Sequence, residues 1–153
     1  MAEQTTRRGY KIVKVVPTLG DAYCSTVDFR LYSWQYNSLP REVAVEYKPG
    51  VAAVPKLEGS ALYAFRYLRD TLHIARSSSL NVEVWEVDLV PTRRQRRRRL
   101  WNNTTLETIT AFWASVPKYK LSYVTDNPAG TIHCSEITLR RLIWSTEKGL
   151  VMK

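Results

Sequence analysis

Most hydrophobic residues of this chain fall into short runs rich in β-branched and aromatic side chains, a pattern typical of strands. The predicted strands span residues 10–16, 22–27, 43–47, 81–89, 119–124 and 131–144. The strongest is 81–89, and Pro91 ends it. Its alternation predicts that both faces are at least partly covered, one through Val82 and Val84 and the other through Trp85, Val87 and Leu89.

One helix is predicted after Gly59, with Ser60 as its cap and its end in the serines 77–79. Its apolar stripe recurs at spacings of three and four, through Ala61, Phe65, Leu68, Leu72 and Ala75. A basic flank runs beside this stripe and consists of Arg66, Arg69, His73 and Arg76.

A second helix is predicted from the capping box at 104–107. Its apolar face would hold Leu106, Ile109, Trp113 and Val116. The segments Lys48-Pro49-Gly50 and 126–130 have the composition of turns. Together these elements predict an α+β fold, with a mostly antiparallel sheet of six or seven strands and one or two helices. Residues 1–8 form a flexible N-terminus in this prediction, and 9–153 form a single domain.

Charge changes this picture at one place. The chain has 23 Lys and Arg against 14 Asp and Glu, a formal net charge of +9. Six of those cations are arginines within residues 93–99, which leaves 17 basic against 14 acidic residues elsewhere. Such a block cannot enter a core without leaving charges unpaired, so it is expected on a loop or at the exposed start of a helix.

This arginine segment, residues 93–99, predicts contact with nucleic acid or another polyanion, because each guanidinium can hold a phosphate by two hydrogen bonds. Trp101 offers a face on which a base can stack. The candidate binding residues are Arg93, Arg94, Arg96, Arg97, Arg98, Arg99 and Trp101, extended by Arg66, Arg69 and Arg76. A solvated loop, an acidic protein surface, an acidic membrane surface and a nuclear-localisation signal are the alternatives.

Several other function classes find little support in the sequence. No apolar run is long enough for a bilayer helix, and the N-terminus lacks the apolar core of a signal peptide, so an intracellular protein is expected. Two cysteines and two histidines provide no zinc-ligand set, and no metal is expected. The aromatic residues Tyr32, Trp34 and Tyr36 are expected to cover the core or to contact a partner.

The order of the elements also resembles a known family. The segments that carry the likeness are Tyr10-Lys11, Tyr23-Cys24-Ser25, Val45-Glu46-Tyr47 with the Lys48-Pro49-Gly50 turn, Gly59-Ser60, Leu62-Tyr63-Ala64-Phe65, Val84-Trp85-Glu86-Val87 and Cys134 to Ile143. This order is similar to that of small, uncharacterised phage and virus domains whose fold is related to ADP-ribosyltransferases. The likeness covers most of residues 9–144 and rests on order and spacing.

The resemblance implies a candidate catalytic pair. By position, Ser25 stands for the second-strand hydroxyl that holds NAD in active ADP-ribosyltransferases, and Glu136 for the catalytic carboxylate. The first strand departs from the family, because it offers Lys11 and Lys14 where an Arg or His is expected. A lysine lacks the planar fork that an arginine presents to a pyrophosphate.

Three hypotheses follow. The first is a viral or phage-type accessory protein of the host cytoplasm or the virion, which binds nucleic acid or an acidic protein surface and needs no cofactor. The second is a nucleotide-binding or ADP-ribosyltransferase-like enzyme that uses NAD, Ser25 and Glu136. The third is a structural or assembly protein of a viral particle, which would form a homo-oligomer.

Overall fold

The structure is a computed structural model that describes residues 5–16, 23–26, 45–77, 81–95, 98–100, 110, 112–114, 124–126 and 129–151. Its strands are β1 (Arg7–Val16), β2 (Tyr23–Thr26), β3 (Val45–Tyr47), β4 (Leu62–Phe65), β5 (Val82–Pro91), β6 (Arg98–Leu100), β7 (Val124–Asp126), β8 (Thr131–Ser145) and β9 (Gly149–Leu150). The helix is α1 (Leu68–Ser77). The predicted α+β class with a mostly antiparallel sheet and a helix is therefore confirmed.

The main sheet closes on itself. β1 pairs with β5 along its length, β5 pairs with β8, β8 pairs with β4, and β4 returns to β1 at the pair Tyr10 and Phe65. β2 pairs with the end of β1 on the side away from β5, and β3 pairs with β2; both pairings are antiparallel. The segment after β3 reaches β8 as well, because Ala53 and Ile137 exchange two backbone hydrogen bonds of 2.8 and 3.0 Å. This arrangement is a small barrel.

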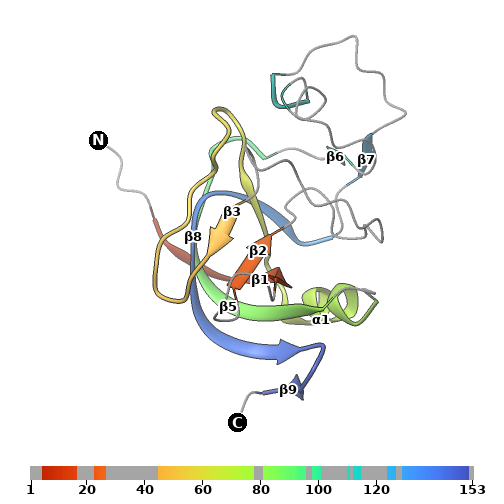
Figure 1. Ribbon diagram of the computed structural model, residues 1–153. Helices are drawn as coiled ribbons and strands as arrows, with labels where there is room; N and C mark the ends of the chain where they lie inside the picture. Colours follow the sequence, from red (N-terminus) through yellow and green to blue (C-terminus); the bar gives the residue numbers. More distant parts are fainter. Residues whose placement is uncertain are drawn as a thin grey trace.

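β8 is the common partner of the barrel. One of its sides pairs with β5 from Cys134 to Ser145. The other side pairs first with β4, then with the segment around Ala53, and finally with β9. In Figure 1 this long blue strand curves past most of the other elements of the fold.

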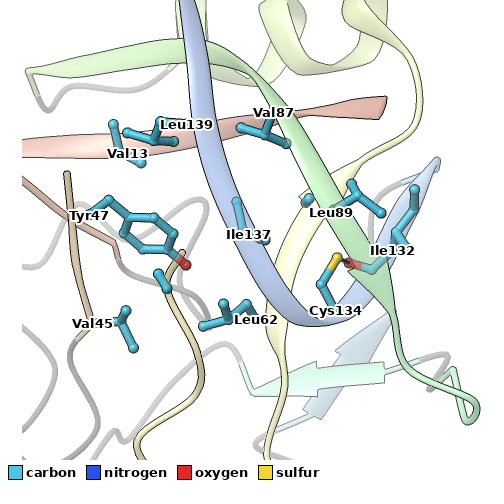
Figure 2. Packing of buried hydrophobic residues seen from close by; sticks show 12 residues of the cluster. Val13, Val45, Tyr47, Leu62, Val87, Leu89, Ile132, Cys134, Ile137 and Leu139 are labelled. Atoms are coloured by element: carbon cyan, nitrogen blue, oxygen red, sulfur yellow. Dashed lines mark hydrogen bonds between the residues drawn. The ribbon is translucent and has the colours of Figure 1, made fainter. Parts of the chain in front are cut away.

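The barrel interior holds the larger hydrophobic cluster. It comprises Val13, Val45, Tyr47, Ala53, Leu62, Ala64, Val87, Leu89, Ile132, Cys134, Ile137 and Leu139, all buried. Figure 2 shows these side chains converging from strands that are far apart in sequence. Gly9 allows β1 to approach closely, because a Cβ at this position would lie 2.5 Å from Leu89 Cδ2 and 2.9 Å from the Phe65 carbonyl oxygen.

Lys11 also belongs to the interior, with 1% of its surface exposed. Its Nζ donates a hydrogen bond to the Tyr63 carbonyl and lies 5.5 Å from the centroid of the Tyr47 ring. Lys11 was one of the two first-strand cations considered for a pyrophosphate. Its burial keeps its ammonium group away from the protein surface in this structure.

A second cluster forms on the outside of the barrel, where α1 covers β1, β5 and β8. It comprises Ile12, Phe65, Ile74, Ala75, Val82, Val84 and Ile143, with Leu68, Leu72 and Trp144 packed against it. The two faces predicted for β5 are confirmed, because Val82 and Val84 pack under the helix, whereas Val87 and Leu89 point into the barrel.

The predicted start of the first helix is wrong. Residues 62–65 form β4, and α1 begins only at Leu68. All four residues of β4 are buried, and they pair with 131–134 of β8. A short apolar run that is covered on both sides has no strand periodicity, so partners distant in sequence decided its conformation. Ser60 does not cap the helix; its hydroxyl donates to the Leu57 carbonyl at 2.6 Å.

Other boundaries also differ from the prediction. β1 begins at Arg7, so Arg7 and Arg8 pair with Leu89 and Asp88 and are not part of a frayed terminus. Five predicted strands lie in the main sheet, which also includes the short β4 and β9. The predicted strand 119–124 lies outside the described residues except for Val124, the first residue of β7, which pairs with β6 outside the main sheet.

The predicted second helix lies mostly outside the described residues. Within them, the Ala114 N–H donates to the Thr110 carbonyl at 3.0 Å, which is one helical turn, and Trp113 is buried. None of the helices described here is long and apolar enough to cross a membrane. The aromatic residues 32, 34 and 36 lie outside the described ranges.

Candidate polyanion-binding site

The arginine segment starts where β5 leaves the barrel. Just after Pro91, the Thr92 N–H donates to the His133 carbonyl at 2.9 Å, which extends the pairing with β8 by one residue. The Thr92 hydroxyl then donates to the Arg94 carbonyl at 2.8 Å and closes a bend. Arg93 and Arg94 lie in this bend and are exposed.

Gln95, the one residue of the arginine segment that is not arginine, anchors it to β8. Its Oε1 accepts the His133 N–H at 2.7 Å, and its Nε2 donates to the His133 carbonyl at 2.9 Å. The side-chain amide thus reproduces the paired donor and acceptor of a neighbouring strand. Nε2 also donates to the Thr92 carbonyl at 3.1 Å, so the same amide stabilises the bend.

The residue that receives this anchor is itself held firmly. His133 is 1% exposed and lies opposite Tyr63 in the β4–β8 register. Its ring centroid is 4.7 Å from that of Tyr63 and 6.1 Å from that of Trp113. Oε1 of Gln95 lies 3.2 Å from His133 Nδ1 as well. The start of the arginine segment therefore rests on a packed aromatic group.

The end of the segment lies in a β-ribbon, the two-stranded pair of β6 with β7. Arg98 is opposite Asp126, Arg99 opposite Thr125 and Leu100 opposite Val124. In Figure 1 the two short strands lie outside the main sheet. The expectation of a loop over 93–99 is therefore wrong for Arg98 and Arg99, while Arg96, Arg97 and Trp101 lie outside the described residues.

The predicted extension toward α1 is reached from the other side of β8. The Arg66 N–H donates to the Gly130 carbonyl at 2.8 Å. Gly130 precedes His133 by three residues, so about 10 Å of chain separates this bond from the Gln95 anchor. Arg66 and Arg69 are exposed at the beginning of the helix. Arg76, also exposed, lies about 10 Å from Arg69 along the helix axis.

Three further arginines, which the sequence did not single out, lie beside the C-terminal half of β5, close to where the arginine segment begins. Nε of Arg140 lies 2.7 Å from Asp88 Oδ2, and Nη2 of Arg141 lies 3.3 Å from Glu86 Oε2. Nε of Arg8 lies 3.9 Å from Glu86 Oε1. We call this set, Arg8, Glu86, Asp88, Arg140 and Arg141, the braced cluster.

A β-bulge explains how two successive residues of β8 reach the same face. Arg141 is opposite Glu86, but Leu139 is opposite Val87, so Arg140 is an extra residue in the β8 strand. Strict alternation places residues 140 and 141 on opposite faces, and the sequence carries no turn residue that marks the irregularity. Alternation along the sequence places Glu86 and Asp88 on the same face as Val82 and Val84, but it does not identify the partners of these carboxylates.

The predicted catalytic pair lies on strands that are not hydrogen-bonded to each other. Ser25 is on β2, opposite Lys14 of β1 and Glu46 of β3. Glu136 is on β8, half-buried and opposite Val90 of β5. The side chain of Ser25 lies outside what the structure describes, so a shared cleft stays a prediction that rests on the resemblance.

The described residues contain no candidate metal site. No three His, Cys, Asp or Glu side chains lie there in a group that could hold a metal ion. Cys134 is buried in the barrel interior, and its Sγ donates to the Ile132 carbonyl at 3.7 Å.

Comparison with known proteins gives no family for the chain. No protein-family model, no curated protein and no solved structure matches it. The functional argument therefore rests on the residues and contacts given above.

Proposed function

We propose that this protein binds nucleic acid through the arginine segment. The observation that carries the proposal is the Gln95 anchor, which fixes one end of a highly cationic segment to the barrel and leaves Arg93 and Arg94 exposed. The β6–β7 ribbon holds the backbone of the other end. A segment whose two ends are hydrogen-bonded to other strands loses less conformational entropy on binding than a free loop of the same composition.

The chemistry of the segment supports a phosphate ligand. Guanidinium groups bind phosphate oxygens through paired, charge-assisted hydrogen bonds, and a nucleic acid releases condensed counterions when cations replace them. Contacts of this kind position the protein on a phosphate backbone without reading the bases. The proposed activity is accordingly binding with little sequence preference, and Arg66 and Arg69 lie close enough to the anchor to extend the surface.

The test compares two triple variants that remove the same charge. One replaces Arg97, Arg98 and Arg99 with Ser; the matched control replaces the exposed lysines Lys48, Lys56 and Lys148 with Ser. Affinity for a labelled oligonucleotide, single-stranded and duplex, is measured between about 50 and 200 mM salt. The urea midpoint of each variant is measured in parallel, so that loss of folding is recognised.

The arginine variant should lose most of its affinity. Each phosphate contact contributes about 0.7 to the slope of log affinity against log salt on single strands, so three lost contacts lower the slope by about 2. The lysine variant should keep its slope. Equal losses in both variants would show a response to net charge alone, and a folded protein that binds neither oligonucleotide, or only an acidic protein, would refute the proposal.

A further inference from the structure

The braced cluster lies on the outer face of β5, beyond the part of that face that α1 covers. Its carboxylates come from β5 and its arginines from the two strands on either side, Arg8 from β1 and Arg140 and Arg141 from β8. Its location matters because β5 runs directly from this cluster into the arginine segment. From Asp88 to Arg93 the chain advances five residues, which span at most about 17 Å because the chain bends after Pro91.

The carboxylates of the braced cluster are more buried than its arginines. The side chains of Glu86 and Asp88 are 15% and 29% exposed, whereas those of Arg8, Arg140 and Arg141 are 69%, 52% and 56% exposed. The carboxylates thus lie beneath the arginines. A carboxylate in this place limits the rotamers of the arginine above it, which reduces the entropy lost when the guanidinium binds a further anion.

Arg140 shows how such an arginine remains able to bind. Its contact with Asp88 goes through Nε, at 2.7 Å. The two Nη nitrogens form the far end of the guanidinium fork, and this end can hold a phosphate by two parallel hydrogen bonds. With three arginines and two carboxylates, the cluster keeps one positive charge.

We propose that the nucleic-acid surface continues from the arginine segment along β5 onto the braced cluster, with Arg140 as a direct phosphate ligand. This inference rests on the proposed function and deepens it, because it assigns the ligand a length. A distance of up to about 17 Å corresponds to about five phosphates on one strand of B-form DNA, in which each phosphate advances 3.4 Å along the helix axis. The partner is therefore an extended phosphodiester chain and not a single nucleotide.

The experiment compares Arg140→Ser with Lys148→Ser, which removes the same charge from the exposed turn that follows the C-terminal end of β8. Oligonucleotide affinity is measured as a function of salt for both. Arg140→Ser should weaken binding about fivefold near 0.1 M salt and lower the salt slope by about 0.7 to 0.9, the effect of one lost phosphate contact. Lys148→Ser should leave both quantities unchanged.

Two further variants keep the result decisive. Arg140→Lys retains the charge but loses the fork, so it should bind more weakly than the wild type and more tightly than Arg140→Ser. If Arg140→Ser equals Lys148→Ser while the Arg97, Arg98, Arg99 variant still loses binding, the ligand ends at the arginine segment. The inference then fails and the proposed function stands. If the wild type binds no oligonucleotide, both fail.

Discussion

The outer face of β5 divides into two halves that share one strand and one alternation. In the first half Val82 and Val84 lie under α1 and are buried. In the second half Glu86 and Asp88 occupy the same parity, and arginines from β1 and β8 cover them. Behind the second half Val87 and Leu89 lie in the barrel interior, and behind the first half the partly buried Trp85 packs against the same cluster, so the main difference lies in what covers the outer face. The same face of one strand can therefore pack against a helix at one end and form ion pairs with neighbouring strands at the other.

The largest loss of stability is expected when a charged residue is placed in the apolar half of this face. Val84→Glu places a carboxylate under α1 with no cation assigned to it, and should lower the free energy of unfolding by about 4 kcal/mol. The reciprocal Glu86→Val, at an ion-paired and partly exposed position, should change stability by less than about 1 kcal/mol. Urea unfolding of the two variants measures the contrast. Similar losses in both would mean that the halves are not energetically distinct.

The interior that both halves share is tested at Gly9. Gly9→Ala brings a methyl group into contact with Leu89 and with the Phe65 carbonyl oxygen, and only the leucine side chain can move aside. We expect a loss of about 2 kcal/mol, typical of overpacking. The control is Gly59→Ala, where no atom lies within 4 Å but the φ of 81° is strained. A larger loss at Gly59 would argue against close strand contact at Gly9.

The junction between the charged half and the arginine segment is tested by Gln95→Met, which keeps the side-chain length but removes the amide. Global stability should fall by about 1 kcal/mol, because the His133 N–H loses the Gln95 acceptor while the His133 carbonyl keeps the Thr92 N–H. Cleavage by trypsin after Arg93 and Arg94 should accelerate more than the change in the urea midpoint implies, because the segment opens locally. Unchanged cleavage would show that the anchor is not needed to hold the segment.

The smallest effect is expected inside the braced cluster. Asp88→Asn removes the carboxylate beneath Arg140, but the pair lies at the surface and Arg140 is half exposed to solvent, so stability should change by less than about 0.5 kcal/mol. Thermal unfolding at low and high salt provides the measurement, and the small difference should shrink as salt rises. A loss of several kcal/mol would mean that the cluster is a structural element of the barrel and not an addition to its surface.

The sequence predicted what depends on neighbours along the chain. Alternation identified β5 and both of its faces, and the density of arginine located an exposed cationic segment. It failed where the deciding contact is distant. Residues 62–65 have a spacing compatible with a helix and became β4 because β8 pairs with them. The partners of Glu86 and Asp88 depend on a bulge at Arg140, which no local residue marks.

In the candidate site, too, the sequence indicates the local features but not the contacts between distant residues. The cations of the segment were evident, but Gln95 gave no signal apart from being the one residue there that is not arginine. Its partner, His133, follows it by 38 residues, and only the path of β8 brings them together. Arg66 approaches from the other side of β8 for the same reason. Register between distant strands cannot be obtained from a single sequence by periodicity.

The central place of β8 has a consequence for how the chain acquires its fold. β8 follows nearly all of its partners in the chain, so β4 and β5 have no strand on that side until residues 131–145 arrive. Before then, the short hairpin of β1 and β2 can form, and β1 can pair with β5. Pairings between distant residues make folding slow. During that delay the edge of β5 remains open to pairing with other chains, so refolding yield should fall as protein concentration rises.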